Sequence, residues 1–155
     1  MIPKYSIILP TLALSNSYHA FLESLCEVEN LKEGEILIIV NPAQPNFKPS
    51  VPEKLKDITQ VHFSEKGVNR ARNKGIEVAQ GEILFFFDDD CLLLNKTHFQ
   101  KHLNLHSSQP HIAAWGGRYK NIGLSEIDDA YNRIQNRWID MCYNPLNGTY
   151  FSLLG

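Results

Sequence analysis

Apolar residues form short, unbroken runs in the first part of the chain. The runs at residues 5–9, 36–40 and 83–87 carry almost no polar side chains, and a shorter run lies at 61–63. Strands that are buried on both faces show this pattern, whereas half-exposed strands alternate apolar and polar residues. We therefore predict four strands at these places, with Pro10 closing the first one.

Between these runs, apolar residues recur every three or four positions, which is the spacing of an amphipathic helix. This spacing predicts one helix at residues 17–31, with Ser17 as its N-cap, and another at 68–79, ended by Gly81. A short helical turn is predicted at 53–57. Strands that alternate with helices in this way are typical of an α/β protein, with a mostly parallel sheet and helices on both faces.

Less regular patterns occupy the rest of the chain. Prolines are dense from Pro42 to Pro52, which predicts a loop after the second strand. After the fourth strand, the pattern predicts further elements: helices at 97–105 and 125–141, and strands at 112–115 and 149–154. With 155 residues, the whole of 1–155 is expected to belong to one domain.

Composition narrows the classes of protein that fit. The chain is 43% hydrophobic and 21% charged, with a net charge of −2, so we expect a soluble protein that binds no nucleic acid. Cys26, Cys91 and Cys142 show no CxxC spacing, which favours a reducing compartment. No signal peptide or membrane-spanning run is expected, so the predicted location is the cytoplasm, with peripheral membrane association left open.

Three consecutive acids follow the fourth predicted strand. In open parallel sheets, ligands bind beyond the carboxyl ends of the strands, which is where Asp88, Asp89 and Asp90 fall. Mg²⁺ or Mn²⁺ would relieve the repulsion among these carboxylates. If the chain stays extended, Asp88 and Asp90 point to the same side and Asp89 to the other. The alternative is a solvated acidic turn without a ligand.

A basic residue lies on the expected buried face of the second helix. Arg72 falls within the stripe formed by Val68, Ala71, Gly75, Ile76 and Ala79. A buried guanidinium needs an anion. Its partner is either one of the aspartates or a bound diphosphate or base, for which a planar forked donor is well suited. Arg70 is expected on the opposite, solvated face.

These residues form part of a longer pattern. The segment at residues 67–90, GVNRARNKGIEVAQGEILFFFDDD, together with the opening Ile7-Ile8-Leu9-Pro10-Thr11, resembles the family 2 glycosyltransferases of the GT-A fold. That fold has a Rossmann-like, mostly parallel sheet with helices on both faces. The resemblance implies a nucleoside-diphosphate sugar donor, a Mg²⁺ or Mn²⁺ ion, and transfer to an unidentified hydroxyl acceptor with inversion at the sugar carbon.

The resemblance also implies roles for particular residues. Asp90 would hold the metal and Asp88 would contact the ribose or sugar side as well as the metal, while Pro10 and Thr11 would line the nucleoside pocket and Arg72 would lie near the base or phosphates. The metal ligands are thus expected to be Asp88 and Asp90. The expected substrate-binding residues are Pro10, Thr11, Asn41, Arg72, Asp88 and Asp89.

The chain departs from the family pattern in two places. Where the family has aspartates that hold the base, this chain has Asn41, whose amide can still form hydrogen bonds. The general base of the family lies beyond a strand like 149–154, so we expect it beyond residue 155 and the chain to be a truncated fragment with little activity alone. The acids after Asp90 are not assigned this role: Glu126, Asp128, Asp129 and Asp140.

Other readings remain open. A noncatalytic nucleotide-sugar-binding module would also explain Asn41 and the missing base. A nucleotidyltransferase is disfavoured, because no glycine-rich phosphate loop follows Leu9. His98, His102 and His106 share the spacing of one helix face and form a weak candidate for a zinc site.

Overall fold

The computed structural model describes residues 2–13, 15–41, 48–115, 143–144 and 149–150. The chain divides into two compact units, residues 1–103 and 104–155. The first unit holds the strands β1 (Tyr5–Thr11), β2 (Gly34–Val40), β3 (Thr59–Phe63) and β4 (Ile83–Phe86). Its helices are α1 (Asn16–Cys26), α2 (Val68–Val78) and the 3₁₀ helices η1 (Leu31–Glu33) and η2 (Glu53–Ile58).

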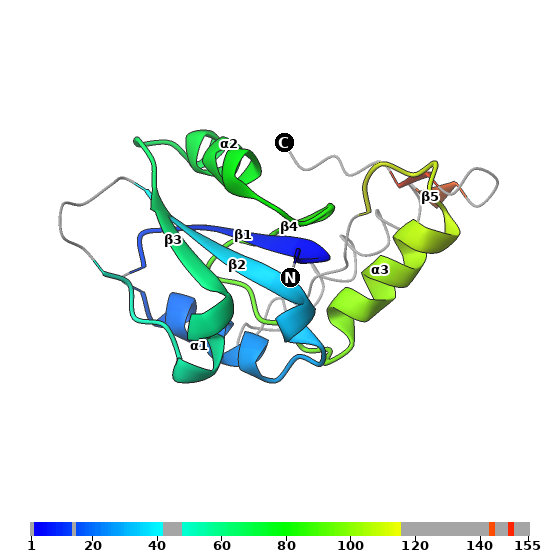
Figure 1. Ribbon diagram of the computed structural model, residues 1–155. Coiled ribbons are helices and arrows are strands. Elements are labelled where there is room, and N and C mark those ends of the chain that lie inside the picture. The colour runs from blue at the N-terminus through cyan, green and yellow to red at the C-terminus, as the bar shows by residue number, and fades with distance from the viewer. Residues whose placement is uncertain (1, 14, 42–47, 116–142, 145–148, 151–155) are drawn as a thin grey trace, which may run out of the picture. The chain divides into compact units, whose positions relative to one another are not determined.

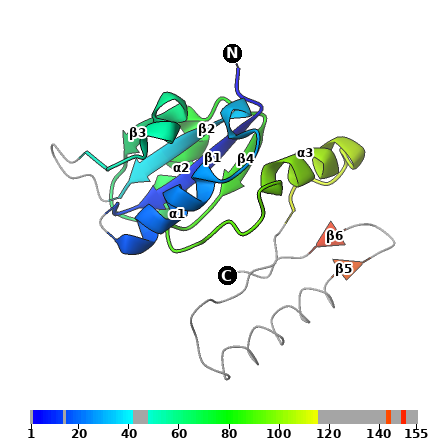
Figure 2. The same ribbon diagram turned by 90° about the horizontal axis from the view of Figure 1, so that it is seen from below.

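The four strands form one parallel sheet in the order β3-β2-β1-β4. Tyr5 is level with Gly34 of β2 on one side and with Ile83 of β4 on the other. The chain therefore moves outward from β1 to β3 and then crosses back over β1 to reach β4. Because parallel crossovers are right-handed, connections that run in opposite directions place α1 and α2 on opposite faces, as Figure 1 and Figure 2 show. The expected α/β architecture is confirmed.

The two faces of the sheet are packed differently. On the α1 face, Tyr5, Ile7 and Leu9 pack in one buried cluster with Phe21 and Leu25. On the α2 face, a smaller buried cluster is made by four residues: Ile8, Leu37, Ile39 and Ala71. The sheet's central strands are thus buried on both sides, which explains their unbroken apolar sequence.

Pro10 does not close the first strand, contrary to our prediction. β1 continues to Thr11, with Pro10 paired to Ile39 of β2. On the β4 side, pairing ends where the Phe87 N–H donates to the Ile8 carbonyl at 3.2 Å. The N–H that Pro10 lacks would face that same side, two residues further along, where no described strand runs. The proline therefore ends the pairing with β4 without ending β1.

The predicted beginning of α1 was wrong by two residues. The N-cap is Ser15, whose hydroxyl accepts the Tyr18 N–H at 3.1 Å. This start brings Tyr18 onto the buried face one turn before Leu22. The helix ends at Cys26, and Leu31 belongs to η1.

Two expectations about α2 were also wrong. Gly81 is not a C-terminal helix cap, because α2 ends at Val78 with Ala79 as its C-cap. A Cβ at Gly81 would lie 2.3 Å from the Tyr5 carbonyl carbon. The glycine is needed for this close approach of two backbones. In the stripe expected to be buried, Ala71 is buried, but Val68 and Ile76 are 50% and 48% exposed. The smallest side chains make the contact with the sheet, and the larger ones lie outside it.

The later elements are described in part. Helix α3 runs from His98 to Ser108, and Phe99 in its first turn is buried in the α1-face cluster. Residues 112–115 are not a strand, because a turn with Ile112 N–H bonded to Gln109 O leads into irregular chain. β5 (Tyr143–Asn144) and β6 (Thr149–Tyr150) form an antiparallel pair, and the predicted elements at 125–141 and 151–154 lie outside the described residues. None of the helices described is long and apolar enough to cross a membrane.

Candidate functional site at the carboxyl ends of β1 and β4

The strand order creates a switch point between β1 and β4. The chain moves outward from β1 to β2 and β3 and then returns to place β4 on the other side of β1, so the strand order reverses here. In open α/β sheets, ligands bind outside the carboxyl ends of the strands at such a point. Thr11 is the last residue of β1, and the acidic residues 88–90 follow β4 with only Phe87 between. The tertiary structure thus brings the opening Pro-Thr pair and the acidic triplet to one edge of the sheet.

The triplet is a turn rather than an extension of β4. The strand ends at Phe86, and the Cys91 N–H donates to the Asp88 carbonyl at 3.3 Å. The premise that Asp88, Asp89 and Asp90 alternate along an extended chain is therefore wrong. A turn forms because β1 no longer offers a pairing partner on this side beyond Ile8.

Thr11 holds the middle acid of the turn. Its hydroxyl donates to Asp89 Oδ2 at 2.5 Å and accepts the Ala13 N–H at 2.7 Å, and the threonine is only 5% exposed. Ala13 has a φ of 55°, a left-handed conformation that the Thr11 hydroxyl helps to hold. Nearby, burial raises the pKa of Tyr18 to about 12, with a further contribution from the charge of Asp89.

Arg72 holds the first acid. Its Nη2 donates to Asp88 Oδ1 at 2.9 Å, so of the two predicted partners the structure shows an aspartate. The Arg72 side chain is 38% exposed and that of Asp88 59% exposed, which corrects the expectation of a buried arginine. The same side chain lines a cavity of about 410 Å³ with four other residues: Asn69, Asn73, Ile76 and Phe86.

Asn41 is bound to the loop before α2. Its Oδ1 accepts the Gly67 N–H at 3.1 Å, and its Nδ2 donates to Ser64 Oγ, to Glu65 O and, at 2.7 Å, to Gly67 O. Gly67 has a φ of 130°, which a residue with a Cβ rarely adopts. The amide therefore orders the entry into α2, and contact with a nucleobase remains a prediction.

The third acid differs from the first two. Among the residues that the structure describes, no hydrogen bond or ion pair involves the side chain of Asp90, which is exposed. Nor do any three His, Cys, Asp or Glu side chains of the described part form a metal-binding group. A cation held by Asp88 and Asp90 would thus need further oxygen ligands from elsewhere, as Mg²⁺ commonly takes from phosphates and water.

The histidines on α3 do not supply an alternative metal site within the described residues. The rings of His98 and His102 lie 4.8 Å apart, but they do not form a three-ligand group with His106. Burial against Phe85, Phe87 and other rings lowers the pKa of His98 to about 4, helped by the charges of His102 and Lys101. His98 is therefore neutral at ordinary pH.

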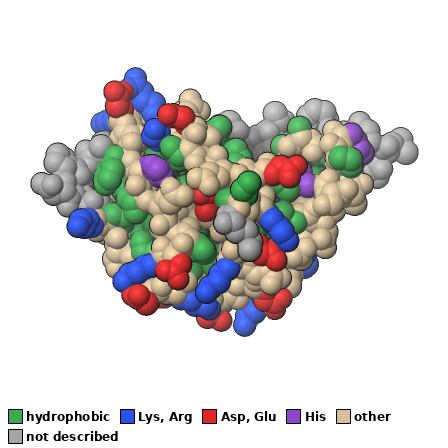
Figure 3. All heavy atoms as spheres, in the orientation of Figure 1, with side chains coloured by type: hydrophobic (Ala, Val, Ile, Leu, Met, Phe, Trp, Pro, Cys, Tyr) green, Lys and Arg blue, Asp and Glu red, His purple; other side chains and the backbone are tan. Residues whose placement is uncertain are grey.

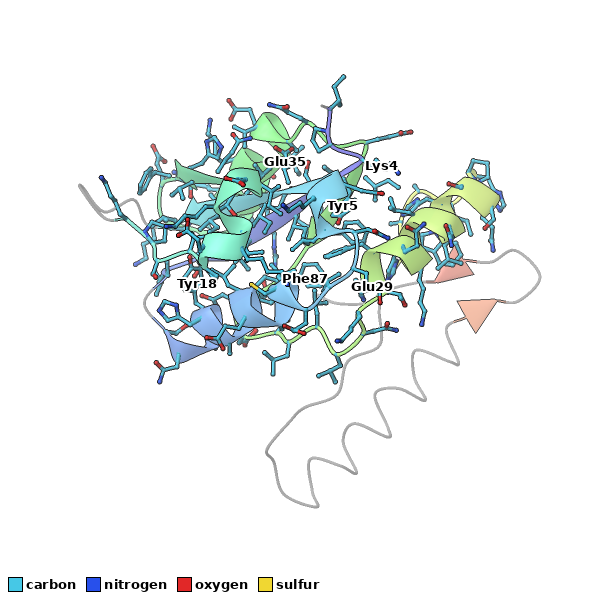
Figure 4. The ribbon with its side chains drawn as sticks, turned by 60° about the horizontal axis from the view of Figure 1, so that its bottom comes forward. Lys4, Tyr5, Tyr18, Glu29, Glu35 and Phe87 are labelled. Carbon is cyan, nitrogen blue, oxygen red and sulfur yellow. The ribbon has the colours of Figure 1, made fainter. Side chains whose placement is uncertain are left out.

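Tyr18, a buried tyrosine whose pKa is influenced by Asp89, was not identified in the sequence analysis. Tyr18 donates to the Ser50 carbonyl at 3.0 Å and is fully buried near Asp89; the helical spacing of residues 18, 21, 22 and 25 could have identified it. Figure 4 shows Tyr18 and, towards the opposite end of the strands, Glu35. On the face shown in Figure 3, acidic and basic side chains are interspersed.

Solved structures with a similar fold include TarS from S. aureus. TarS 1-349 has a TM-score of 0.57 at 19% identity, covering 78% of this chain and 40% of that one. TarS 1-349 in complex with UDP-GlcNAc has a TM-score of 0.55 at 19% identity, with 78% and 38% covered. At this identity, the likeness shows the fold, an α/β arrangement of the GT-A kind.

Sequence comparisons point to one family. EpsH of Bacillus subtilis (strain 168), whose name describes it as a glycosyltransferase, is 34% identical over 58 residues, which cover 35% of this chain and 17% of EpsH. The chain thus spans less than half of these relatives. The profile of the family described as "Glycosyl transferase family 2" matches residues 6–150, across both the Thr11 strand end and the acidic turn. With nearly its whole length matched, the chain belongs to glycosyl transferase family 2.

Proposed function

We propose that this chain binds a nucleoside-diphosphate sugar at the carboxyl ends of β1 and β4 and takes part in metal-dependent transfer of the sugar to an acceptor hydroxyl. The observation that carries the proposal is the arrangement of Arg72 and Asp88 beside Asp90 at the switch point, in a chain of this family. It is supported by the fold shared with TarS, of which a complex with UDP-GlcNAc is known.

The residues of the turn fit a divalent cation that arrives with its ligand. Asp88 and Asp90 offer carboxylate oxygens, which Mg²⁺ and Mn²⁺ prefer, and the described side chains provide no third ligand. Oxygens of the diphosphate would complete the shell, so we expect the protein to bind the metal well only when the nucleotide is present. Such a cation would supply positive charge to neutralise the negative charge of the departing diphosphate.

Arg72 has the chemistry to contact the same diphosphate. Its planar guanidinium carries donors beyond the one used by Asp88, and its partial exposure leaves them accessible. We infer that Arg72 orients the Asp88 carboxylate and donates to phosphate oxygens. Pro10, Thr11, Asn41 and Asp89 would then shape the nucleoside side of the site.

The proposed chemistry is an inverting transfer. The acceptor hydroxyl attacks the sugar carbon on the face opposite the leaving diphosphate and loses its proton to a carboxylate base. We propose that this base lies outside the residues that the structure describes. A reducing, cytoplasmic setting is part of the same proposal, in keeping with the free thiols of Cys26 and Cys91.

Calorimetric titration of UDP, GDP and dTDP, with and without Mn²⁺, tests the proposal. We expect one of the three to bind in the presence of Mn²⁺ and Asp90→Ala to weaken that binding at least about 10-fold, as losing a metal ligand should. Asp57→Ala is the matched control, since it removes an exposed carboxylate from η2 near the amino ends of the strands.

Each titration result has a definite meaning. Absence of binding by all three nucleotides, with either Mn²⁺ or Mg²⁺, would refute the proposal. Binding that is equal in the wild type and Asp90→Ala would refute the metal site. Nucleotide binding by the full natural protein without any sugar transfer or donor hydrolysis would instead favour a noncatalytic binding module.

A further inference from the structure

The hydroxyl of Thr11 makes two hydrogen bonds within the protein. It donates its one proton to Asp89 and accepts the N–H of Ala13, and the residue is 5% exposed. A hydroxyl has one donor and two lone pairs. Thr11 therefore has no proton to offer a ligand while it holds Asp89, so any contact with a nucleoside would have to use its second lone pair or its methyl group.

The turn of residues 88–91 is anchored at successive positions. Asp88 is held by Arg72 from α2, and Asp89 by Thr11 from β1. The Cys91 N–H closes the turn on the Asp88 carbonyl. Asp90 lies between these bonded residues, so the three hydrogen bonds restrict its backbone and influence the direction in which its side chain leaves the turn.

We propose that Thr11 is a positioning residue that, by holding Asp89, fixes the turn and thereby aims the carboxylate of Asp90 at the cation. This inference rests on the proposed function, in which Asp90 is a metal ligand. Residues that hydrogen-bond to metal-binding side chains, or hold them in place, contribute strongly to metal affinity. Without them, the carboxylate must be ordered when the metal binds. In this proposal, Asp89 holds the turn through Thr11, and Asp90 contacts the metal.

Two measurements on the same variants test this proposal. Hydrogen exchange of the Cys91 amide reports whether the turn is held. Electron paramagnetic resonance titration of Mn²⁺ in the presence of UDP, or of the nucleotide that binds, reports whether holding it matters for the cation. The variants are Thr11→Val, which removes the hydroxyl at nearly constant volume, Thr11→Ser, which keeps it, and Thr59→Val. Thr59 is the control, a strand threonine whose hydroxyl bonds to Leu55 O at 2.7 Å, far from the turn.

We expect Thr11→Val to speed exchange at Cys91 and to weaken Mn²⁺ binding about 10- to 100-fold. Thr11→Ser keeps the hydroxyl, so its exchange rate at Cys91 and its Mn²⁺ affinity should be close to those of the wild type. Thr59→Val should change neither quantity. Asp89→Ala removes the same hydrogen bond from the more exposed side, which keeps the test decisive if Thr11→Val does not fold. In the double variant the losses should not add, because both changes break one interaction.

The outcomes separate this inference from the function on which it rests. If the wild type binds Mn²⁺ and Thr11→Val and Asp89→Ala bind it equally well, Thr11 is not a positioning residue and the proposed function stands. The same conclusion follows if exchange at Cys91 is unchanged. If the wild type binds no Mn²⁺ with any nucleotide, the proposed function itself fails, whatever the exchange measurement shows.

Discussion

Arg72 and Asp88 form an ion pair that ties α2 to the chain leaving β4, with Arg72 Nη2 2.9 Å from Asp88 Oδ1. Both side chains are partly exposed, so water screens their attraction, and pairs of this kind contribute at most about 1 kcal/mol to stability. The pair lies at the switch point of the sheet. Its importance is therefore expected in ligand binding more than in folding.

Replacing Arg72 should separate these two effects. We expect Arg72→Ala to lower the free energy of unfolding by less than about 1 kcal/mol and to weaken nucleotide binding at least about 10-fold. Arg72→Lys should recover only part of the affinity, because an ammonium cannot donate as a planar fork. Denaturant unfolding and calorimetry measure the two quantities. Arg70→Ala, which removes an exposed arginine paired with Glu65, should leave nucleotide affinity unchanged.

Glu35 should be important for folding and not for the site. This carboxylate is 6% exposed and accepts hydrogen bonds from Ser6 Oγ at 2.6 Å, Gln80 N at 2.7 Å and Gln60 Nε2 at 3.0 Å. Glu35→Ala leaves buried donors unsatisfied, so we expect a loss of about 2–4 kcal/mol in urea unfolding.

Glu33 supplies the comparison for Glu35. Its ion pair with Lys4 is exposed, so Glu33→Ala should cost less than about 1 kcal/mol. Equal losses of unfolding free energy for the two alanine variants would contradict the interpretation that the buried hydrogen bonds of Glu35 stabilise the fold. A large loss of nucleotide affinity in folded Glu35→Ala would contradict its separation from the site.

His98 should make stability depend on acidic pH. Its pKa falls from 6.5 to about 4 on folding, chiefly through burial, so the folded state favours the neutral ring. The stabilisation is complete above about pH 6.5 and is lost as the pH falls through about 4. Because the ring is only part-buried, we discount the shift and expect about 1–2 kcal/mol.

Urea unfolding at pH 7 and pH 4.5 measures the contribution of His98. The wild type should lose more stability between these values than His98→Leu, which keeps an apolar side chain among the aromatic rings and cannot titrate. Identical losses in both proteins would show that His98 does not bind fewer protons in the folded state.

Alanine at two glycines should test the close packing around β1. At Gly75, a Cβ would lie 2.4 Å from Ile8 Cγ2, a side-chain atom, so the clash should outweigh the usual gain of about 1 kcal/mol in helix propensity. We expect a net loss of about 1–2 kcal/mol. At Gly81, the clash is with the backbone of Tyr5 and Ser6, which cannot turn away, so about 3 kcal/mol is expected.

Thermal unfolding measures the order of these variants. Asn73→Ala, at an exposed position of α2, is the control and should be neutral or slightly stabilising. If Gly75→Ala raised the melting temperature as much as Asn73→Ala, α2 would not pack on Ile8 as closely as the structure shows.

The sequence by itself determined the elements of the sheet, its class and the family signature. Buried strands such as β2 and the helix α2 leave local patterns of apolar residues, and the run from Gly67 to Asp90 is continuous in sequence. Such patterns arise from burial and helix geometry over a few neighbouring residues, so they can be read without knowing what the chain packs against.

Only the tertiary structure decided which side chains, far apart in the sequence, are in contact. Thr11 and Asp89 are 78 residues apart, and their hydrogen bond depends on β1 and β4 being neighbours in the sheet. The attachment of Asn41 to the loop at Gly67 likewise depends on where β2 and β3 end. Strand order and register fix such pairs, and no periodicity along the chain encodes them. The acids were therefore visible in the sequence, whereas their anchors were not.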